Sequence, residues 1–147
     1  MLARVATVAE LFDQLCLRWA READLAHQER GQTVPTLVVL PRDPAADEVA
    51  IQVDGLRGYL AERAPAILAD LRPVVAPHDP AGLVFVTPNG VDGVAVYVTL
   101  GTTDLRRAVG LTVVPGLPPS LTRAESDPDV EAFTWLDALL TPDPRST

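Results

Sequence analysis

Proline is the residue that most limits what this chain can fold into. The sequence of 147 residues holds 14 prolines. Because proline lacks a backbone N–H and has a fixed φ, it is poorly tolerated inside helices and in central strands. Most of the prolines fall into four clusters: Pro41 with Pro44, Pro73 with Pro77 and Pro80, Pro115 with Pro118 and Pro119, and Pro142 with Pro144. We therefore expect connections at these clusters and look for helices and strands between them.

A long first helix is predicted near the N-terminus. Residues 7–10, Thr-Val-Ala-Glu, form a capping box, and apolar residues follow at helical spacing. Gly31 is a typical helix end, so we expect the helix over about residues 8–30. The second half of this helix is mostly polar, and we expect that half to extend beyond the core.

The same apolar spacing predicts two further helices. The second helix carries its apolar residues over positions 56–71, and Pro65 within it is expected to kink the helix or split it in two. Residues 73–82 are rich in proline and predict a connection. Ser126 is a typical cap for a last helix that runs to about residue 140.

Five short runs rich in β-branched and apolar residues predict strands. They cover residues 36–40, 49–53, 83–87, 94–100 and 108–114. The first two are expected to pair antiparallel. The third and fourth flank a turn that contains Asn89 and Gly90, and strands on either side of an Asn-Gly turn predict a β-hairpin.

The order α-β-β-α-β-β-β-α predicts an α+β fold. The simplest assembly is an antiparallel or mixed five-stranded sheet with about three helices packed on one side. We expect a single domain over residues 1–147, with an ordered core of about 5–141 and a flexible tail at 142–147. This order of elements resembles the roadblock and profilin-like group and, more loosely, GAF-type sensor domains. The likeness is one of element order without a shared motif, and a fold does not determine a function.

Composition argues against several classes of protein. The chain has 12 basic residues, all of them arginine, and 20 acidic residues, and the net charge of −8 argues against a nucleic-acid binder. No apolar run is long enough to span a bilayer, and the N-terminus lacks the apolar core of a signal peptide, so we expect a cytoplasmic protein without membrane association. Lysine is absent, asparagine occurs once and isoleucine twice. Because the codons of these three residues are AT-rich, their rarity indicates a high-GC and typically bacterial genome.

His78 and Asp79, which stand between two prolines, most resemble a catalytic pair. A histidine oriented by a carboxylate suits a general base or a metal ligand, but adjacent residues seldom point the same way, and a polar turn is the favoured interpretation. Arg106 and Arg107 are a second ligand candidate, since paired arginines can clamp an anion; a salt-bridged turn is the alternative. His27, the other histidine, lies far away in the sequence. We therefore predict no catalytic residue, no metal site and no cofactor.

The single cysteine, Cys16, excludes an internal disulfide and a multi-cysteine zinc site. It lies in mid-helix, about one turn from Phe12 and Trp19, and it matches no nucleophile motif. We expect it to be a small buried hydrophobic residue.

The predicted sheet has two faces that are both partly apolar. In the fourth strand, valines and a leucine alternate with Ala95, Tyr97 and Thr99, and the neighbouring strands show the same pattern. An antiparallel sheet that faces water on one side normally carries more polar residues there. Either a second helix layer or a partner covers this face, and the sequence leaves both open. We expect a partner to contact the sheet around Tyr97 and Thr99, or the first helix near Trp19.

The sequence therefore favours a non-enzymatic, acidic interaction module. Such a protein would be an adaptor, a chaperone-like protein or a regulatory protein that binds a protein partner or pairs with itself as a homodimer. A small-molecule-sensing domain of the GAF or profilin-like type is an alternative, and a closed apolar pocket would indicate it. The third possibility is a small enzyme that uses His78 with Asp79 or Arg106.

Overall fold

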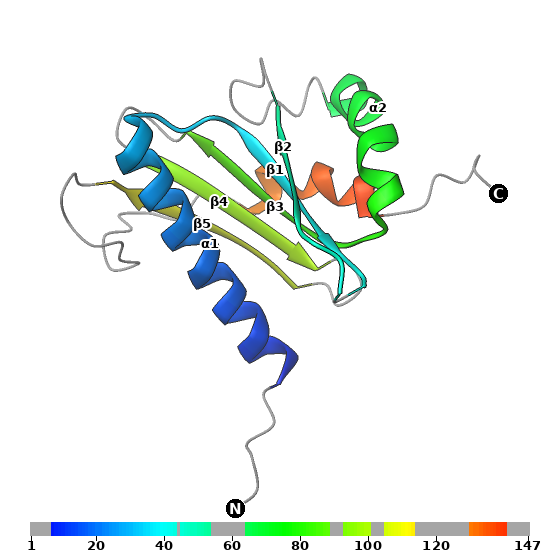
Figure 1. Ribbon diagram of the computed structural model, residues 1–147, viewed down its shortest axis with the longest axis horizontal. Helices are drawn as coiled ribbons and strands as arrows, with labels where there is room; N and C mark the ends of the chain where they lie inside the picture. Colours follow the sequence, from blue (N-terminus) through cyan, green and yellow to red (C-terminus); the bar gives the residue numbers. More distant parts are fainter. Residues whose placement is uncertain are drawn as a thin grey trace, which may run out of the picture.

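Five antiparallel strands form one sheet, and helices pack on both of its faces (Figure 1). The computed structural model describes residues 7–43, 45–53, 64–88, 93–100, 105–113 and 130–140. The elements are α1 (Val8–Arg30), β1 (Thr36–Pro41), β2 (Val49–Gln52), α2 (Ala64–Val75), η2 (Ala76–His78), β3 (Pro80–Pro88), β4 (Gly93–Leu100), β5 (Leu105–Thr112), η4 (Val130–Ala132) and η5 (Thr134–Leu140), where η marks a 3₁₀ helix. The predicted α+β fold with an antiparallel five-stranded sheet is confirmed.

The helix α1 forms where its end signals predict it. The side-chain oxygen of Thr7 accepts a hydrogen bond from the N–H of Glu10 at 3.1 Å. At the other end Gly31 has a left-handed backbone with φ 74°, and its N–H donates to the carbonyl of His27 at 2.8 Å. Both ends of the helix are therefore satisfied by residues adjacent to it in the sequence.

The polar second half of α1 lies against the sheet. Ala20, Ala23 and Asp24 are buried there, and the side chain of Gln28 donates a 2.5 Å hydrogen bond to Asp24. In Figure 1 the N-terminal turns are the ones that extend past the strands. The expectation that the second half extends beyond the core is therefore wrong. A narrow stripe of small buried residues is enough for a mostly polar helix to pack on a sheet.

The strand order in the sheet is β2-β1-β3-β4-β5, and every neighbouring pair is antiparallel. The prolines delimit these strands as the sequence predicts: Pro41, Pro80 and Pro88 each stand at a strand end. The adjacent strands β3 and β4 pair as the predicted hairpin, and the turn at residues 89–92 lies outside the described residues.

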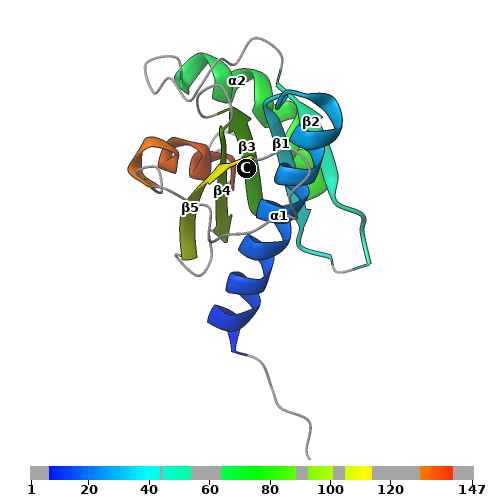
Figure 2. The same ribbon diagram turned by 90° about the vertical axis from the view of Figure 1, so that its left-hand side faces the viewer.

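Alternation along the strands divides most of the buried residues between two cores. The α1-side core contains Phe12, Cys16, Ala23, Val38, Val84, Val86, Val94, Val96, Val98 and Val113. The α2-side core contains Leu37, Val39, Leu71, Val75, Leu83, Phe85, Ala95, Tyr97, Ala108, Phe133, Leu136 and Leu139. In Figure 2, α1 (blue) and the segments η4 and η5 (orange) lie on opposite sides of the strands. A second layer thus covers the face that the sequence left open, and the expectation of helices on one side only is wrong.

The connection before β3 is shorter than the proline cluster predicts. The helix α2 continues through Pro73 to Val75, and only a 3₁₀ turn separates it from β3. Pro73 stands in the last turn, where it is exposed and removes a single helical hydrogen bond. Pro65 stands in the first turn of α2, where proline is tolerated because the first N–H groups have no partner within the helix. Residues 54–63 of the expected helix lie outside the described residues.

The last helix differs in type from the prediction. Residues 130–140 form two 3₁₀ segments, η4 and η5, instead of an α-helix, and Ser126 lies outside the described residues. Leu136 and Leu139 of η5 are nevertheless buried, as the apolar pattern predicts. Within the described ranges, no helix has the length and apolar character needed to cross a bilayer.

Candidate functional site

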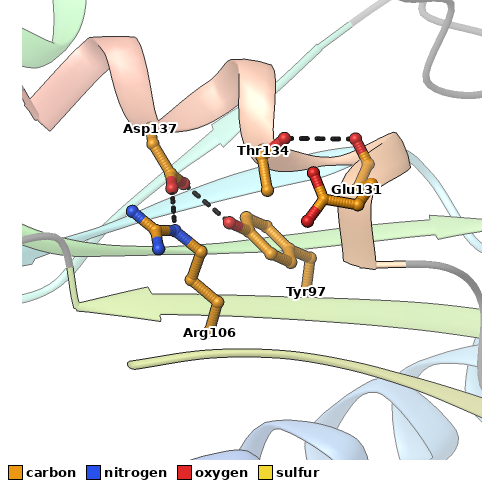
Figure 3. A network of polar contacts seen from close by, with 5 residues as sticks. All are labelled: Tyr97, Arg106, Glu131, Thr134 and Asp137. Carbon is orange, nitrogen blue, oxygen red and sulfur yellow. Dashed lines mark hydrogen bonds and ion pairs between the residues drawn. The ribbon is translucent and has the colours of Figure 1, made fainter. Parts of the chain in front are cut away.

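Tyr97, Arg106 and Asp137 form a polar cluster between the sheet and η5 (Figure 3). The hydroxyl of Tyr97 donates a 2.6 Å hydrogen bond to Oδ1 of Asp137. The guanidinium Nε of Arg106 donates to the other carboxylate oxygen, Oδ2. Tyr97 is fully buried, whereas the side chains of Asp137 and Arg106 are 16% and 31% exposed. The cluster therefore runs from the interior of the molecule to its surface.

Strand alternation and register bring these residues together. Arg106 pairs with Thr99, and Tyr97 pairs with Ala108, on the adjacent strands β4 and β5. Since side chains alternate between faces, Tyr97, Thr99 and Arg106 all belong to the α2-side face. Asp137 reaches them from η5, 40 residues beyond Tyr97 and 31 beyond Arg106. The carboxylate thus links three elements that are distant in the sequence.

Further contacts hold η4 and η5 in place. The hydroxyl of Thr134 donates to the carbonyl of Glu131 at 3.1 Å, which joins the two segments (Figure 3). From α2, Arg72 donates to the carbonyl of Ala138 at 3.1 Å. The ring of Phe133 stacks on Tyr97 with 5.3 Å between centroids. The polar cluster is therefore part of a larger set of contacts that attach a short 3₁₀ segment to the sheet.

The chemistry open to this cluster is limited. Burial, followed by the hydrogen bond to Asp137, raises the pKa of the Tyr97 phenol above its ordinary value. Tyr97 is therefore a neutral hydrogen-bond donor near neutral pH and a poor nucleophile. Asp137 uses one oxygen for Tyr97 and the other for Arg106. Each group has a structural partner, and the arrangement is suited to holding η5 on the sheet.

The structure places His78 and Asp79 in a turn, apart from this cluster. His78 is exposed at the end of η2. Asp79 has a left-handed backbone with φ 46°, and its carbonyl accepts the N–H of Arg42 at 2.9 Å. The carboxylate of Asp79 lies 3.5 Å from Nε of Arg42. These contacts join the start of β3 to the end of β1, which fits the polar-turn interpretation.

The two adjacent arginines belong to different ion pairs. Arg106 faces η5, whereas Nη1 of Arg107 lies 3.8 Å from the carboxylate of Asp13 on α1. Neighbouring residues of a strand point to opposite faces, so this pair cannot clamp one anion between them. Among the described residues, no group of three histidine, cysteine or acidic side chains is placed to hold a metal ion.

Of the three residues expected at an interface, two are buried and one is partly exposed. Tyr97 and Thr99 are both 0% exposed, and the contacts of η5 take the place that the sequence left for a partner. A partner does not reach them in this fold. Trp19 is partly buried beside the α1-side core, and the guanidinium of Arg18 lies 4.9 Å from its ring centroid. Of these three residues, only Trp19 on α1 is near the surface.

Cys16 is buried in the α1-side core, as expected. Burial raises the pKa of its thiol to about 11. The thiol is therefore protonated near neutral pH and shielded from reagents.

Sequence reasoning missed Asp137 and Glu48. Asp137 is the one acidic residue in the apolar run 135–140, and a carboxylate in such a run needs a partner if the run is buried. That signal identifies the residue but not its partners. Glu48 lies just before β2 and accepts two hydrogen bonds from Arg18 of α1, at 2.7 and 2.8 Å. No local pattern indicates this pair, whose members are 30 residues apart.

No protein-family model matches this chain, and no curated protein and no solved structure is detectably similar to it.

Proposed function

We propose that this chain is a non-catalytic interaction module that binds a protein partner through the outer face of α1. One observation carries the proposal. The large apolar side chains that stay exposed in the described residues are Leu11 at 54%, Leu25 at 46% and Val74 at 45%. Two of the three lie on α1, and the third stands alone on α2.

Leu11 and Leu25 share one face of the helix. At about 100° per residue they point within about 40° of each other, and Arg18 lies midway between them. The buried residues of α1, such as Phe12 and Cys16, lie on the opposite side. In Figure 1, α1 lies in front of the sheet, and no helix or strand of the described chain crosses its outer face.

The chemistry-bearing residues support a non-catalytic role. Tyr97, Asp137 and Arg106 are engaged with one another beneath η5. Asp79 takes part in the turn before β3, and Cys16 is buried with a raised thiol pKa. The net charge of −8 disfavours unspecific aggregation while it still permits one defined apolar contact.

Site-specific photo-cross-linking in cells that express the full chain tests this function. A photoreactive amino acid replaces Leu11 or Leu25 on α1, and Val74 on α2 is the matched control because its exposure is similar. We expect discrete protein adducts from the two α1 positions and none of them from position 74. Equal adduct patterns at all three positions, or none from α1, would contradict the proposal.

A further inference from the structure

We infer that the partner is a second copy of this chain, and that the two α1 helices pack antiparallel about a two-fold axis at Arg18. This inference rests on the proposed function, since it concerns the same face of α1. It adds the identity of the partner and the register of the contact.

The first argument is symmetry. A two-fold interface is self-complementary, so each residue at the interface must meet a counterpart that is related by the axis. Leu11 and Leu25 each lie seven residues from Arg18, which is about 10 Å along the helix on either side. An antiparallel pair centred on Arg18 therefore places Leu11 of one copy against Leu25 of the other. The axis generates this contact twice, and it covers both exposed leucines of α1.

The second argument is charge. An axis at Arg18 brings two guanidinium groups together, which would be unfavourable for unpaired charges. Both oxygens of Glu48 hold the guanidinium of Arg18, at 2.7 and 2.8 Å, and the ring of Trp19 lies beneath it at 4.9 Å from its centroid. The positive charge at the axis is thus already matched by a carboxylate within each copy.

Glu22 adds a carboxylate from the other side. It is exposed and lies one turn beyond Arg18 on the outer face of α1. In an antiparallel pair centred on Arg18, Glu22 of each copy lies about 6 Å along the axis from Arg18 of the other, within reach of its long side chain. Two arginines are then matched by four carboxylates, two from Glu48 and two from Glu22. The face is complementary to itself in charge as well as in the positions of its exposed leucines.

Other surfaces are less suited to a second copy. At one end of the sheet, Ala108, Val109 and Leu111 of β5 are only 5%, 3% and 4% exposed. At the other end, the exposed residues of β2 are Ala50 and Gln52, which offer little apolar surface. Tyr97 and Thr99 are buried on the α2-side face. The outer face of α1 is the described surface that holds two of the three exposed large apolar side chains.

Cysteine cross-linking of the purified full chain tests the register. Leu11→Cys and Leu25→Cys are made separately in a Cys16→Ala background, and the two proteins are mixed and treated with a short thiol-specific bifunctional reagent. We expect the mixture to give a cross-linked dimer that contains one chain of each kind. Each variant alone should give at least about tenfold less, because an antiparallel pair holds identical positions about 21 Å apart along the axis. Val74→Cys is the control and should stay uncross-linked.

Four outcomes would overturn the inference. Efficient cross-linking of each variant with itself would indicate parallel helices. Equal yields from the mixture and the Val74→Cys control would indicate random collision. If no variant cross-links while the photoreactive residues on α1 still capture a protein of different mass, the second copy is wrong and the proposed function stands. Loss of both signals would remove the proposed function as well.

Discussion

One face of the sheet is covered by a single regular helix, whereas the other is covered by α2 together with short 3₁₀ segments. The helix α1 satisfies its own backbone through 23 residues and two end caps, and it needs only an apolar stripe to stay on the sheet. The 3₁₀ helix η5 has seven residues, and 3₁₀ runs of that length are uncommon because their hydrogen bonds are poorer. We expect η5 to depend on anchors that α1 does not need.

The polar contacts of the two layers show the same difference. At η5, the carboxylate of Asp137 is 16% exposed and is shared by Tyr97 and Arg106. At α1, the carboxylate of Asp13 is 70% exposed and lies 3.8 Å from Arg107. The ion pair that joins η5 to the sheet is therefore mostly buried, whereas the ion pair that joins α1 to the sheet is exposed. The outer face of α1 holds two of the three large apolar side chains that are exposed in the described residues.

The largest effect is expected from Phe133→Ala. Phe133 is fully buried, stacks on Tyr97 and lies 6.3 Å from the ring of Phe85. Its removal leaves a cavity under η5 and should lower the free energy of unfolding by about 3–5 kcal/mol, as chemical denaturation would show. Val74→Ala on the exposed side of α2, outside the proposed contact face, is the control, with an expected change of less than about 0.5 kcal/mol. Similar losses in both variants would contradict the account of η5.

A second comparison uses one substitution in both layers. Asp137→Asn removes a charge that Tyr97 and Arg106 share in a mostly buried place, and we expect a loss of about 2–3 kcal/mol. Asp13→Asn removes the exposed partner of Arg107, and the expected loss is less than about 0.5 kcal/mol. Thermal and denaturant unfolding of the two variants would measure the difference. Equal losses would show that η5 is not held by its polar anchor.

High pH should affect the two layers over different ranges. The pKa of Cys16 is raised from 9.0 to about 11 in the folded protein, so the unfolded chain loses this proton first. Stability from Cys16 is complete below pH 9 and falls as the pH rises toward 11, by on the order of 2 kcal/mol. The pKa of Tyr97 is also raised, so its contribution falls only above about pH 10.

Two variants separate these contributions. Cys16→Ala should flatten the loss of stability between pH 9 and 11, and Tyr97→Phe should flatten the loss at higher pH. Denaturant unfolding across this range measures both slopes against the unsubstituted chain. Wild-type slopes in both variants would show that neither group is buried as described.

The smallest effects are expected from two prolines of the same helix. Pro73→Ala restores the backbone N–H in the last turn of α2 and should raise the free energy of unfolding by about 1 kcal/mol. Pro65→Ala in the first turn has no helical hydrogen bond to restore, so a change of less than about 1 kcal/mol is expected. Differential scanning calorimetry of the two variants would measure both changes in stability. A larger gain at Pro65 than at Pro73 would contradict the positions assigned to them.

The sequence predicts those parts of the fold whose causes are local. The ends of α1 depend on Thr7 and Gly31, which act within four residues of themselves, and the predicted and observed bounds agree. Strand alternation likewise predicts all five strands and the hairpin of β3 and β4. The pattern also shows that both sheet faces are apolar, but it does not show what covers them.

The candidate site is less predictable because its causes are not local. Leu136 and Leu139 fit an α-helix or a 3₁₀ helix, and the anchors at Tyr97 and Arg106 are 31 to 40 residues away. The prediction of an α-helix for residues 126–140 fails at residues 130–140, where η5 takes the form that lets Asp137 reach the sheet. In the same way, Arg106 and Arg107 point to opposite faces because both lie within β5, which begins at Leu105. The sequence predicts this strand only from residue 108 onward, so it does not indicate that the two arginines separate.

The most direct test of the claim that two copies of this chain associate through the outer face of α1 is sedimentation equilibrium over a wide range of concentrations. Three proteins are compared: the unsubstituted chain, the double variant Leu11→Ser with Leu25→Ser, and the control Val74→Ser. We predict that the unsubstituted chain and the control rise from the monomer mass of 15.7 kDa toward twice that value, while the double variant stays at 15.7 kDa. Self-association of the double variant equal to that of the unsubstituted chain would contradict a dimer through α1, as would an unsubstituted chain that stays monomeric throughout.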